Sequence, residues 1–115
     1  MKKIFYLSSC STCQRILKEI DTTDFEMQDI KEKNISADEL DFIAEMMGGY
    51  EAIFSKRAMK YRSMGLNSMN LKEEDYRRYM LEEYTFLKRP YVVNNNIVYV
   101  GNAKKTVEKL KADLG

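Results

Sequence analysis

The sequence has no histidine among its 115 residues. Histidine is the usual general base near neutral pH, the usual pH-sensitive switch and the commonest metal-ligating side chain. Any acid–base chemistry must therefore use thiols, carboxylates, lysine, tyrosine or water. Cysteine and proline are also scarce, with two cysteines and one proline in the whole chain. The positions of these three residues become correspondingly informative.

The sequence also lacks an excess of charge and a long apolar segment. Nineteen lysines and arginines almost cancel eighteen acidic residues, which leaves a formal net charge of +1. Direct nucleic-acid binding is therefore not expected, because it needs a basic excess or stripe. No stretch approaches the roughly 20 apolar residues of a membrane span, and the short apolar run after Lys2 and Lys3 does not resemble a signal peptide. We expect a cytoplasmic protein with no membrane contact.

The two cysteines, Cys10 and Cys13, form a C-x-x-C pair. The pair follows a short apolar run and precedes a helical pattern at Ile16, Leu17 and Ile20, so it lies where a strand passes into a helix. Unpaired N–H groups and the helix dipole at such a position favour a thiolate. In a cytosolic chain this spacing is typical of catalytic, sensing or metal-binding cysteines. We interpret it as a redox-active centre.

Cys10 is the candidate nucleophile, because it should be the more exposed sulfur at the helix start, with a lowered thiol pKa. Cys13, one helical turn further on, is the candidate resolving cysteine, which would close an intramolecular disulfide. The alternatives are that either cysteine is simply a small packed hydrophobic residue. A structural zinc site needs four ligands, so two thiolates without histidine would need a second chain; we expect no metal.

The first part of the chain has a strand–helix–strand pattern. Lys3–Leu7 is predicted as a strand, Ser11 to about Ile20 as a helix with Ser9 or Ser11 as its cap, and Phe25–Ile30 as a half-buried strand. A helix between two such strands indicates a β-α-β unit with parallel strands.

The middle of the chain, about residues 34–88, is predicted to be almost entirely helical. Ser36 to Glu39 has a capping-box pattern, and Gly48-Gly49 should end the helix that follows. Further helices are expected over Tyr50–Met64 and from Lys72 to about Phe86. We treat this block as an insertion into a single domain that spans residues 1–115.

The last part of the chain returns to strands. Tyr91–Val93 and Ile97–Val100 flank three asparagines, a strong hairpin signal, and a final helix follows Gly101-Asn102. The order β-α-β, helical block, β-β-α predicts an α/β, thioredoxin-like fold with a four-stranded mixed sheet. The single proline, Pro90, stands at the start of the third strand, where this fold has a cis-proline beside its C-x-x-C pair.

The chain resembles the arsenate reductase/Spx family over essentially its whole length. The resemblance rests on Cys10-Ser11-Thr12-Cys13, on Lys88-Arg89-Pro90, on Val100-Gly101 and on the segment from Gly49 to Arg57. The family includes glutaredoxin-dependent arsenate reductases and Spx-type transcriptional regulators that bind RNA polymerase.

The resemblance implies a set of anion-binding residues around Cys10. Arg57 and Arg89 match family arginines that bind the substrate anion, and a planar guanidinium can hold an oxyanion with two hydrogen bonds. Ser11 and Thr12, at the helix start, are assigned to the same site. A solvated surface position is the alternative for either arginine.

The sequence departs from the family pattern at three places. The arsenate reductases have a histidine four residues before the cysteine and an arginine four residues after it, where this chain has Tyr6 and Gln14. Their third arginine, beyond the proline, has no counterpart after Pro90. Spx-type regulators share the second cysteine but usually have a basic residue where this chain has Gln14.

Two functions from different classes follow from the resemblance. The first is a thiol–disulfide oxidoreductase that reduces arsenate or a disulfide, binds no cofactor, and takes electrons from glutathione and glutaredoxin or from thioredoxin. The second is a redox-sensing regulator that binds the RNA polymerase α subunit, through the region around Gly49. The cluster Tyr76-Arg77-Arg78-Tyr79 could suggest nucleic-acid stacking, but its acidic neighbours favour an amphipathic helix of mixed charge.

Overall fold

A computed structural model describes residues 1–115. Contacts divide the chain into two compact units, which we describe separately: unit 1 contains residues 1–33 and 89–115, and unit 2 contains residues 34–88. That the inserted unit and the rest form a single domain remains a prediction. The chain has no helix long and apolar enough to span a membrane.

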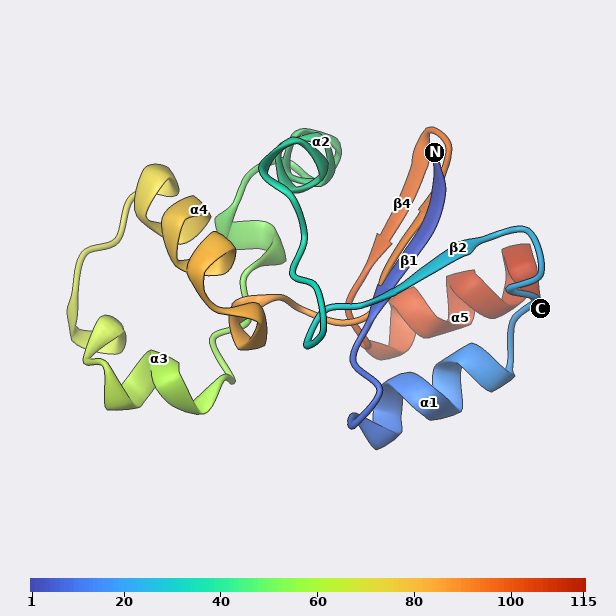
Figure 1. The fold of residues 1–115 in the computed structure, drawn as a ribbon, viewed down its shortest axis with the longest axis horizontal. Helices are drawn as coiled ribbons and strands as arrows, with labels where there is room; N and C mark the ends of the chain where they lie inside the picture. Colours follow the sequence, from blue (N-terminus) through green and yellow to red (C-terminus); the bar gives the residue numbers. More distant parts are fainter. The chain divides into compact units, whose positions relative to one another are not determined.

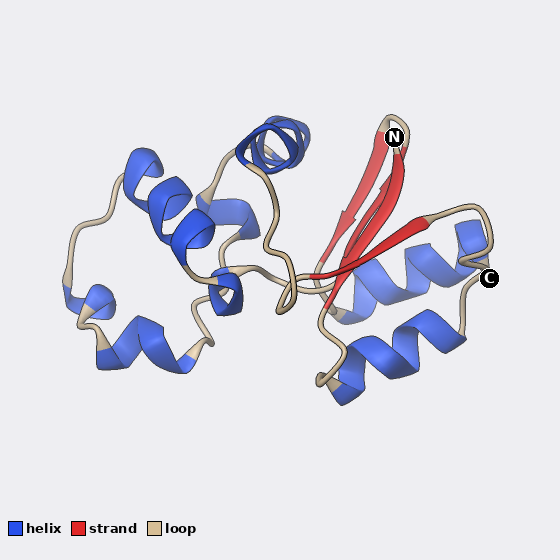
Figure 2. Cartoon of the chain, in the orientation of Figure 1, coloured by secondary structure: helices blue, strands red, loops and turns tan.

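Unit 1 is a four-stranded mixed sheet with two helices (Figures 1 and 2). Its elements, in chain order, are β1 (Lys2–Tyr6), α1 (Ser11–Lys18), β2 (Glu26–Asp29), β3 (Tyr91–Asn94), β4 (Ile97–Val100) and α5 (Lys104–Leu114). The strand order is β2-β1-β3-β4; β1 and β2 run parallel, and the β1–β3 and β3–β4 pairs are antiparallel. This is the predicted β-α-β…β-β-α arrangement, so the α/β fold with a mixed sheet is confirmed.

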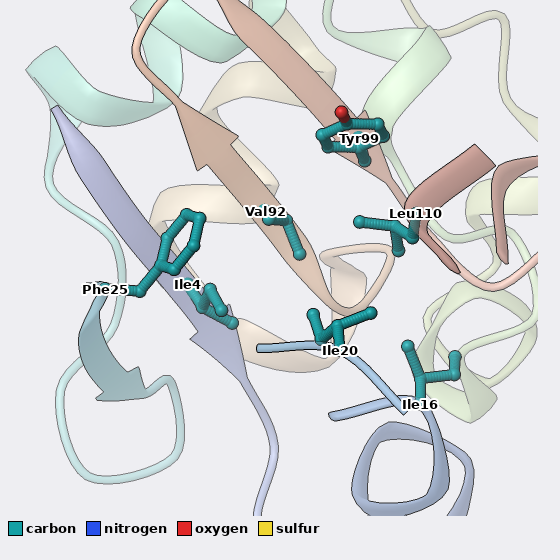
Figure 3. Close-up of a cluster of buried hydrophobic side chains, with 7 residues drawn as sticks. All are labelled: Ile4, Ile16, Ile20, Phe25, Val92, Tyr99 and Leu110. Carbon is teal, nitrogen blue, oxygen red and sulfur yellow. The ribbon is translucent and has the colours of Figure 1, made fainter. Parts of the chain in front are cut away.

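The core of unit 1 lies between one face of the sheet and the two helices. Ile4 pairs with Val92, and Val92 with Tyr99, so these side chains stand in a row across three strands. Ile16 of α1 and Leu110 of α5 cover that row (Figure 3). All seven residues drawn are buried, so both helices pack against the same face of the sheet. The cysteines follow the carboxyl end of β1.

The hairpin predicted for unit 1 is confirmed, whereas the ends of strands and helices differ from the prediction by up to two residues. The hairpin turns at Asn95, whose φ of 55° is the left-handed conformation that asparagine tolerates. The helix α1 ends at Lys18, before the expected Ile20, although Ile20 still packs in the core.

Unit 2 is helical. Its elements are α2 (Ala37–Met47), α3 (Met59–Ser63), α4 (Glu73–Glu82) and the 3-10 turns η1 (Glu51–Ile53), η2 (Leu66–Ser68) and η3 (Tyr84–Phe86). The predicted capping box is present, with reciprocal hydrogen bonds between Ser36 and Glu39, and α2 ends at Gly48 with φ at 91°.

The prediction of one continuous helix over Tyr50–Met64 is wrong. Phe54 is extended and forms an isolated antiparallel bridge with Leu87. The Ser55 N–H donates to the Phe86 carbonyl at 2.7 Å, and the Lys88 N–H donates to the Ile53 carbonyl at 3.2 Å. These long-range backbone bonds replace intrahelical ones, so only η1 and the short α3 remain of the expected helix. The last helix of the block is likewise shorter than expected, since α4 ends at Glu82 and a separate 3-10 turn follows.

Candidate active site

The paired cysteines lie at the junction of β1 and α1. The strand ends at Tyr6, and the Cys10 N–H donates to the Leu7 carbonyl at 3.0 Å, which closes a tight turn. Cys10 is then the N-cap residue of α1, with extended φ and ψ, and the first intrahelical bond runs from the Gln14 N–H to the Cys10 carbonyl. The expected cap at Ser9 or Ser11 is therefore wrong by one residue, because the turn places the sulfur itself at the helix start.

The half-buried Cys10 sulfur faces groups that favour its anion. Its side chain makes no capping hydrogen bond of regular geometry, yet the Cys13 and Thr12 amides lie close enough to act on it. Burial raises the pKa of Cys10, but the Cys13 amide and thiol, the Thr12 amide and the charge of Arg89 outweigh it, so the pKa is lowered. Cys10 is thus the more acidic thiol of the pair, as a nucleophile requires.

Cys13 is fully buried in the first turn of α1. Burial raises the pKa of the Cys13 thiol to about 12, and the negative charge of Cys10 and the hydrogen bond between the two sulfurs act in the same direction. A hydrogen bond with the Leu7 backbone and the charge of Arg89 act against this rise. Cys10 therefore loses its proton at lower pH than Cys13, and the Cys13 thiol donates a hydrogen bond to the Cys10 sulfur.

Arg89 and Pro90 reach the same end of the sheet by topology. They directly precede β3, which runs antiparallel to β1 and pairs Tyr91 with Phe5, so the start of β3 lies beside the end of β1. The Arg89–Pro90 peptide bond is cis, and the Pro90 carbonyl accepts the Gly101 N–H at 2.9 Å. The charge of Arg89 acts on both sulfurs, so the cysteine pair and Arg89, which the sequence pattern predicted as site residues, lie near one another.

The remaining anion-binding candidates have different environments. Ser11 and Thr12 are the first two residues of α1, where their N–H groups lack intrahelical partners. Arg57 is an exposed turn residue of unit 2, which contains none of the other candidates. The anion-binding role of these residues remains a prediction.

Two other features bear on alternatives from the sequence. The structure contains no group of three or more cysteine, aspartate or glutamate side chains that could hold a metal ion. In the Tyr76–Tyr79 cluster both arginines make ion pairs, Arg77 with Asp41 and Arg78 with Asp75, and Tyr76 is buried. These contacts favour the interpretation of α4 as an amphipathic helix of mixed charge.

Sequence reasoning missed a set of polar side chains around the turn before Cys10. The Ser8 hydroxyl donates to Asp29, and the Gln14 side chain donates to the Ser8 carbonyl. One signal was available: in a parallel β-α-β unit the two strand ends meet at one edge, and β1 pairs Tyr6 with Asp29.

The fold and the cysteine pair define a thioredoxin-like protein with a cysteine at the first helix N-cap. The ArsC family model matches residues 5–110, so the chain belongs to the ArsC family. No curated protein matches its sequence.

Several solved structures share the fold over nearly the whole chain. A protein from Bacteroides fragilis, described as related to the ArsC family, is 25% identical, with a TM-score of 0.80 and coverage of 96% of this chain and 97% of that one. An arsenate reductase from Vibrio cholerae is 22% identical, with a TM-score of 0.75 and coverage of 95% and 96%. An arsenate reductase related protein from Brucella melitensis is 22% identical, with a TM-score of 0.68 and coverage of 94% and 92%. The thioredoxin-like prediction is thereby confirmed.

Proposed function

We propose that the protein is a thiol–disulfide oxidoreductase of the ArsC family, with Cys10 as nucleophile and Cys13 as resolving thiol, and with arsenate as a substrate. The observation that carries the proposal is the placement of Cys10 at the N-cap of α1, with Cys13 buried one helical turn further on. The opposite shifts of their two thiol pKa values agree with it. Family membership and the likeness to an arsenate reductase of Vibrio cholerae support the class of reaction.

The chemistry proceeds in three steps. The Cys10 thiolate attacks the arsenic atom, and one arsenate oxygen leaves as water after protonation. The Cys13 sulfur, or an external thiol such as glutathione, then attacks the Cys10 sulfur, and the S–As bond breaks with its electron pair on arsenic, which leaves as arsenite. A dithiol protein of the glutaredoxin or thioredoxin class reduces the resulting disulfide by exchange.

The residues of this chain have separate tasks in that sequence. Arg89 stabilises negative charge at the sulfurs, and its guanidinium would hold the oxyanion. The family resemblance assigns the same task to Arg57. The amides of Ser11 and Thr12 offer unpaired donors at the helix start. Cys13 stays protonated until Cys10 has reacted, and the loss of the Cys10 anion then removes one cause of its raised pKa.

The test is arsenate-dependent NADPH oxidation, coupled through glutathione and glutaredoxin and, separately, through thioredoxin. We expect turnover with at least one donor and none with Cys10→Ser. Turnover that Cys10→Ser leaves unchanged would refute the mechanism.

The alternative is an Spx-like regulator in which the cysteine pair is a switch and the partner is RNA polymerase. The neutral Gln14 after Cys13 does not favour it. Binding to the C-terminal domain of the polymerase α subunit in a pull-down, together with no arsenate reduction, would replace the enzymatic proposal with this one.

A further inference from the structure

The turn that presents Cys10 is fixed by side chains on two other elements. Ser8 lies in this turn and is held at two of its polar groups: its hydroxyl donates to Asp29 Oδ2 at 2.5 Å, and its carbonyl accepts a hydrogen bond from Gln14 Nε2. Asp29 is the last residue of β2, and Gln14 lies in the first part of α1. Side-chain hydrogen bonds therefore connect the turn to β2 and to α1.

The bond between Ser8 and Asp29 is of the strong kind. An O–H donor to a carboxylate at this distance has the length expected of a charge-assisted hydrogen bond. The second oxygen of Asp29, Oδ1, accepts the Lys31 N–H at 3.1 Å, so the carboxylate cannot rotate freely. Hydrogen bonding from Ser8 is the largest cause of the lowered pKa of Asp29, so the carboxylate is ionised at neutral pH.

The turn also determines how the two sulfurs are placed. The Leu7 carbonyl, at its start, accepts the Cys10 N–H at 3.0 Å, and the Leu7 backbone also contacts the Cys13 thiol. A movement of the turn would therefore change the alignment of Cys10 with the amides of α1 and the environment of Cys13 together.

We propose that Ser8, Asp29 and Gln14 are positioning residues, which hold the turn so that Cys10 stays at the N-cap of α1. None of the three reacts with substrate. The inference rests on the proposed redox role of Cys10 and explains one departure from the family pattern, because Gln14 is used to fix the turn. The loss of either hydrogen bond should lower the reactivity of Cys10 without unfolding the protein, since Ser8 and Gln14 are exposed.

The test compares iodoacetamide alkylation of Cys10 across pH in the full chain, with mass spectrometry to identify the modified sulfur and circular dichroism to verify folding. For Ser8→Ala, Asp29→Ala and Gln14→Leu we expect a raised pKa of Cys10 and roughly threefold to tenfold slower alkylation at pH 7, since one pKa unit is a tenfold change. Asp29→Asn keeps a neutral acceptor for Ser8, so it should slow alkylation less than Asp29→Ala does. Ser9→Ala is the matched control, because Ser9 lies in the same turn, is exposed and has no side-chain partner.

The outcomes separate this inference from the proposed function. If Cys10 of the wild type reacts no faster than free cysteine, the redox role itself fails. If the wild type reacts fast and the folded Ser8→Ala and Gln14→Leu variants match it, the positioning role is wrong. Equal slowing by Ser9→Ala, or no rescue by Asp29→Asn, would likewise overturn it.

Discussion

Cys10 and Cys13 lie one helical turn apart at the start of α1, and their thiol pKa values are shifted in opposite directions. The Cys13 amide and thiol stabilise the Cys10 anion, and that anion in turn keeps the proton on Cys13. In the proposed mechanism the two sulfurs thus divide the roles of nucleophile and resolving thiol without a histidine. The predictions below test that division and the packing that supports it.

The two cysteines should give different products when each is replaced. Cys10→Ser removes the attacking thiolate and should abolish reductase activity. Cys13→Ser leaves the attack intact but removes internal resolution, so a mixed disulfide between Cys10 and glutathione should accumulate. Intact mass spectrometry after incubation with oxidised glutathione measures the adduct. An adduct on Cys13 of the Cys10→Ser variant, but none on Cys10 of the Cys13→Ser variant, would reverse the assignment.

Arg89 should contribute to the acidity of Cys10. Arg89→Gln removes a positive charge that favours the thiolate, so the pKa of Cys10 should rise and alkylation at pH 7 should slow by about twofold to fivefold. Arg15→Gln is the matched control, since Arg15 is an exposed arginine of α1 and is not among the groups that act on Cys10. Equal rates for the Arg89→Gln and Arg15→Gln variants would exclude the electrostatic role of Arg89.

The anion-binding role of Arg57 rests on the family resemblance alone, and substitution of Arg57 tests it. If Arg57 binds the oxyanion, Arg57→Gln should raise KM for arsenate about tenfold or more, since a charge-assisted hydrogen bond is worth roughly 1.5–3 kcal/mol. Arg62→Gln, at another exposed arginine of unit 2, is the control. An unchanged KM would assign Arg57 to the solvated surface.

Cys13 should make the fold sensitive to alkaline pH. Because the folded-state pKa is raised to about 12, its contribution to stability is complete below the unfolded pKa and is lost as pH rises from there towards 12. Between pH 7 and pH 10 the free energy of unfolding should fall by about 1–2 kcal/mol more in the wild type than in Cys13→Ala. Urea unfolding at both pH values measures this. Tyr99, whose pKa is also raised to about 12, remains in both proteins, so its effect cancels.

Gly49 and Gly48 offer a matched pair of substitutions in unit 2. A Cβ on Gly49 would lie 2.5 Å from Glu73 Oε1, and that carboxylate accepts the Tyr50 and Glu51 amides at 2.6 and 3.1 Å. A Cβ on Gly48 meets nothing within 4 Å, although both glycines have positive φ. Gly49→Ala should therefore cost about 1–3 kcal/mol more than Gly48→Ala in thermal or urea unfolding. Equal losses would mean that backbone strain alone is measured.

Much of unit 1 was predictable because its signals are local. The apolar run before Cys10, the asparagines of the hairpin and the position of Pro90 each specify a conformation over a few residues. The predicted helix over Tyr50–Met64 failed because Phe54 is held extended by pairing with Leu87, a partner distant in sequence. Helical periodicity cannot reveal such a contact.

In the candidate site, too, some features follow from local sequence signals and others depend on contacts between residues distant in sequence. The cysteine pair and Arg89 follow from motif and topology, whereas the link from Ser8 to Asp29 depends on the register of β1 with β2. Register is set by the packing of a whole strand and is only weakly marked in a four-residue segment. Gln14 was noted as a departure from the family, but its bond to Ser8 requires the turn geometry to be known.

The central claim is that Cys10 is a reactive thiolate at neutral pH, and its alkylation rate relative to free cysteine tests this most directly. With iodoacetamide at pH 7, where free cysteine is mostly protonated, Cys10 should react faster than the free amino acid and Cys13 should stay unmodified. If neither thiol outpaces free cysteine, or if Cys13 is modified first, the redox role is contradicted.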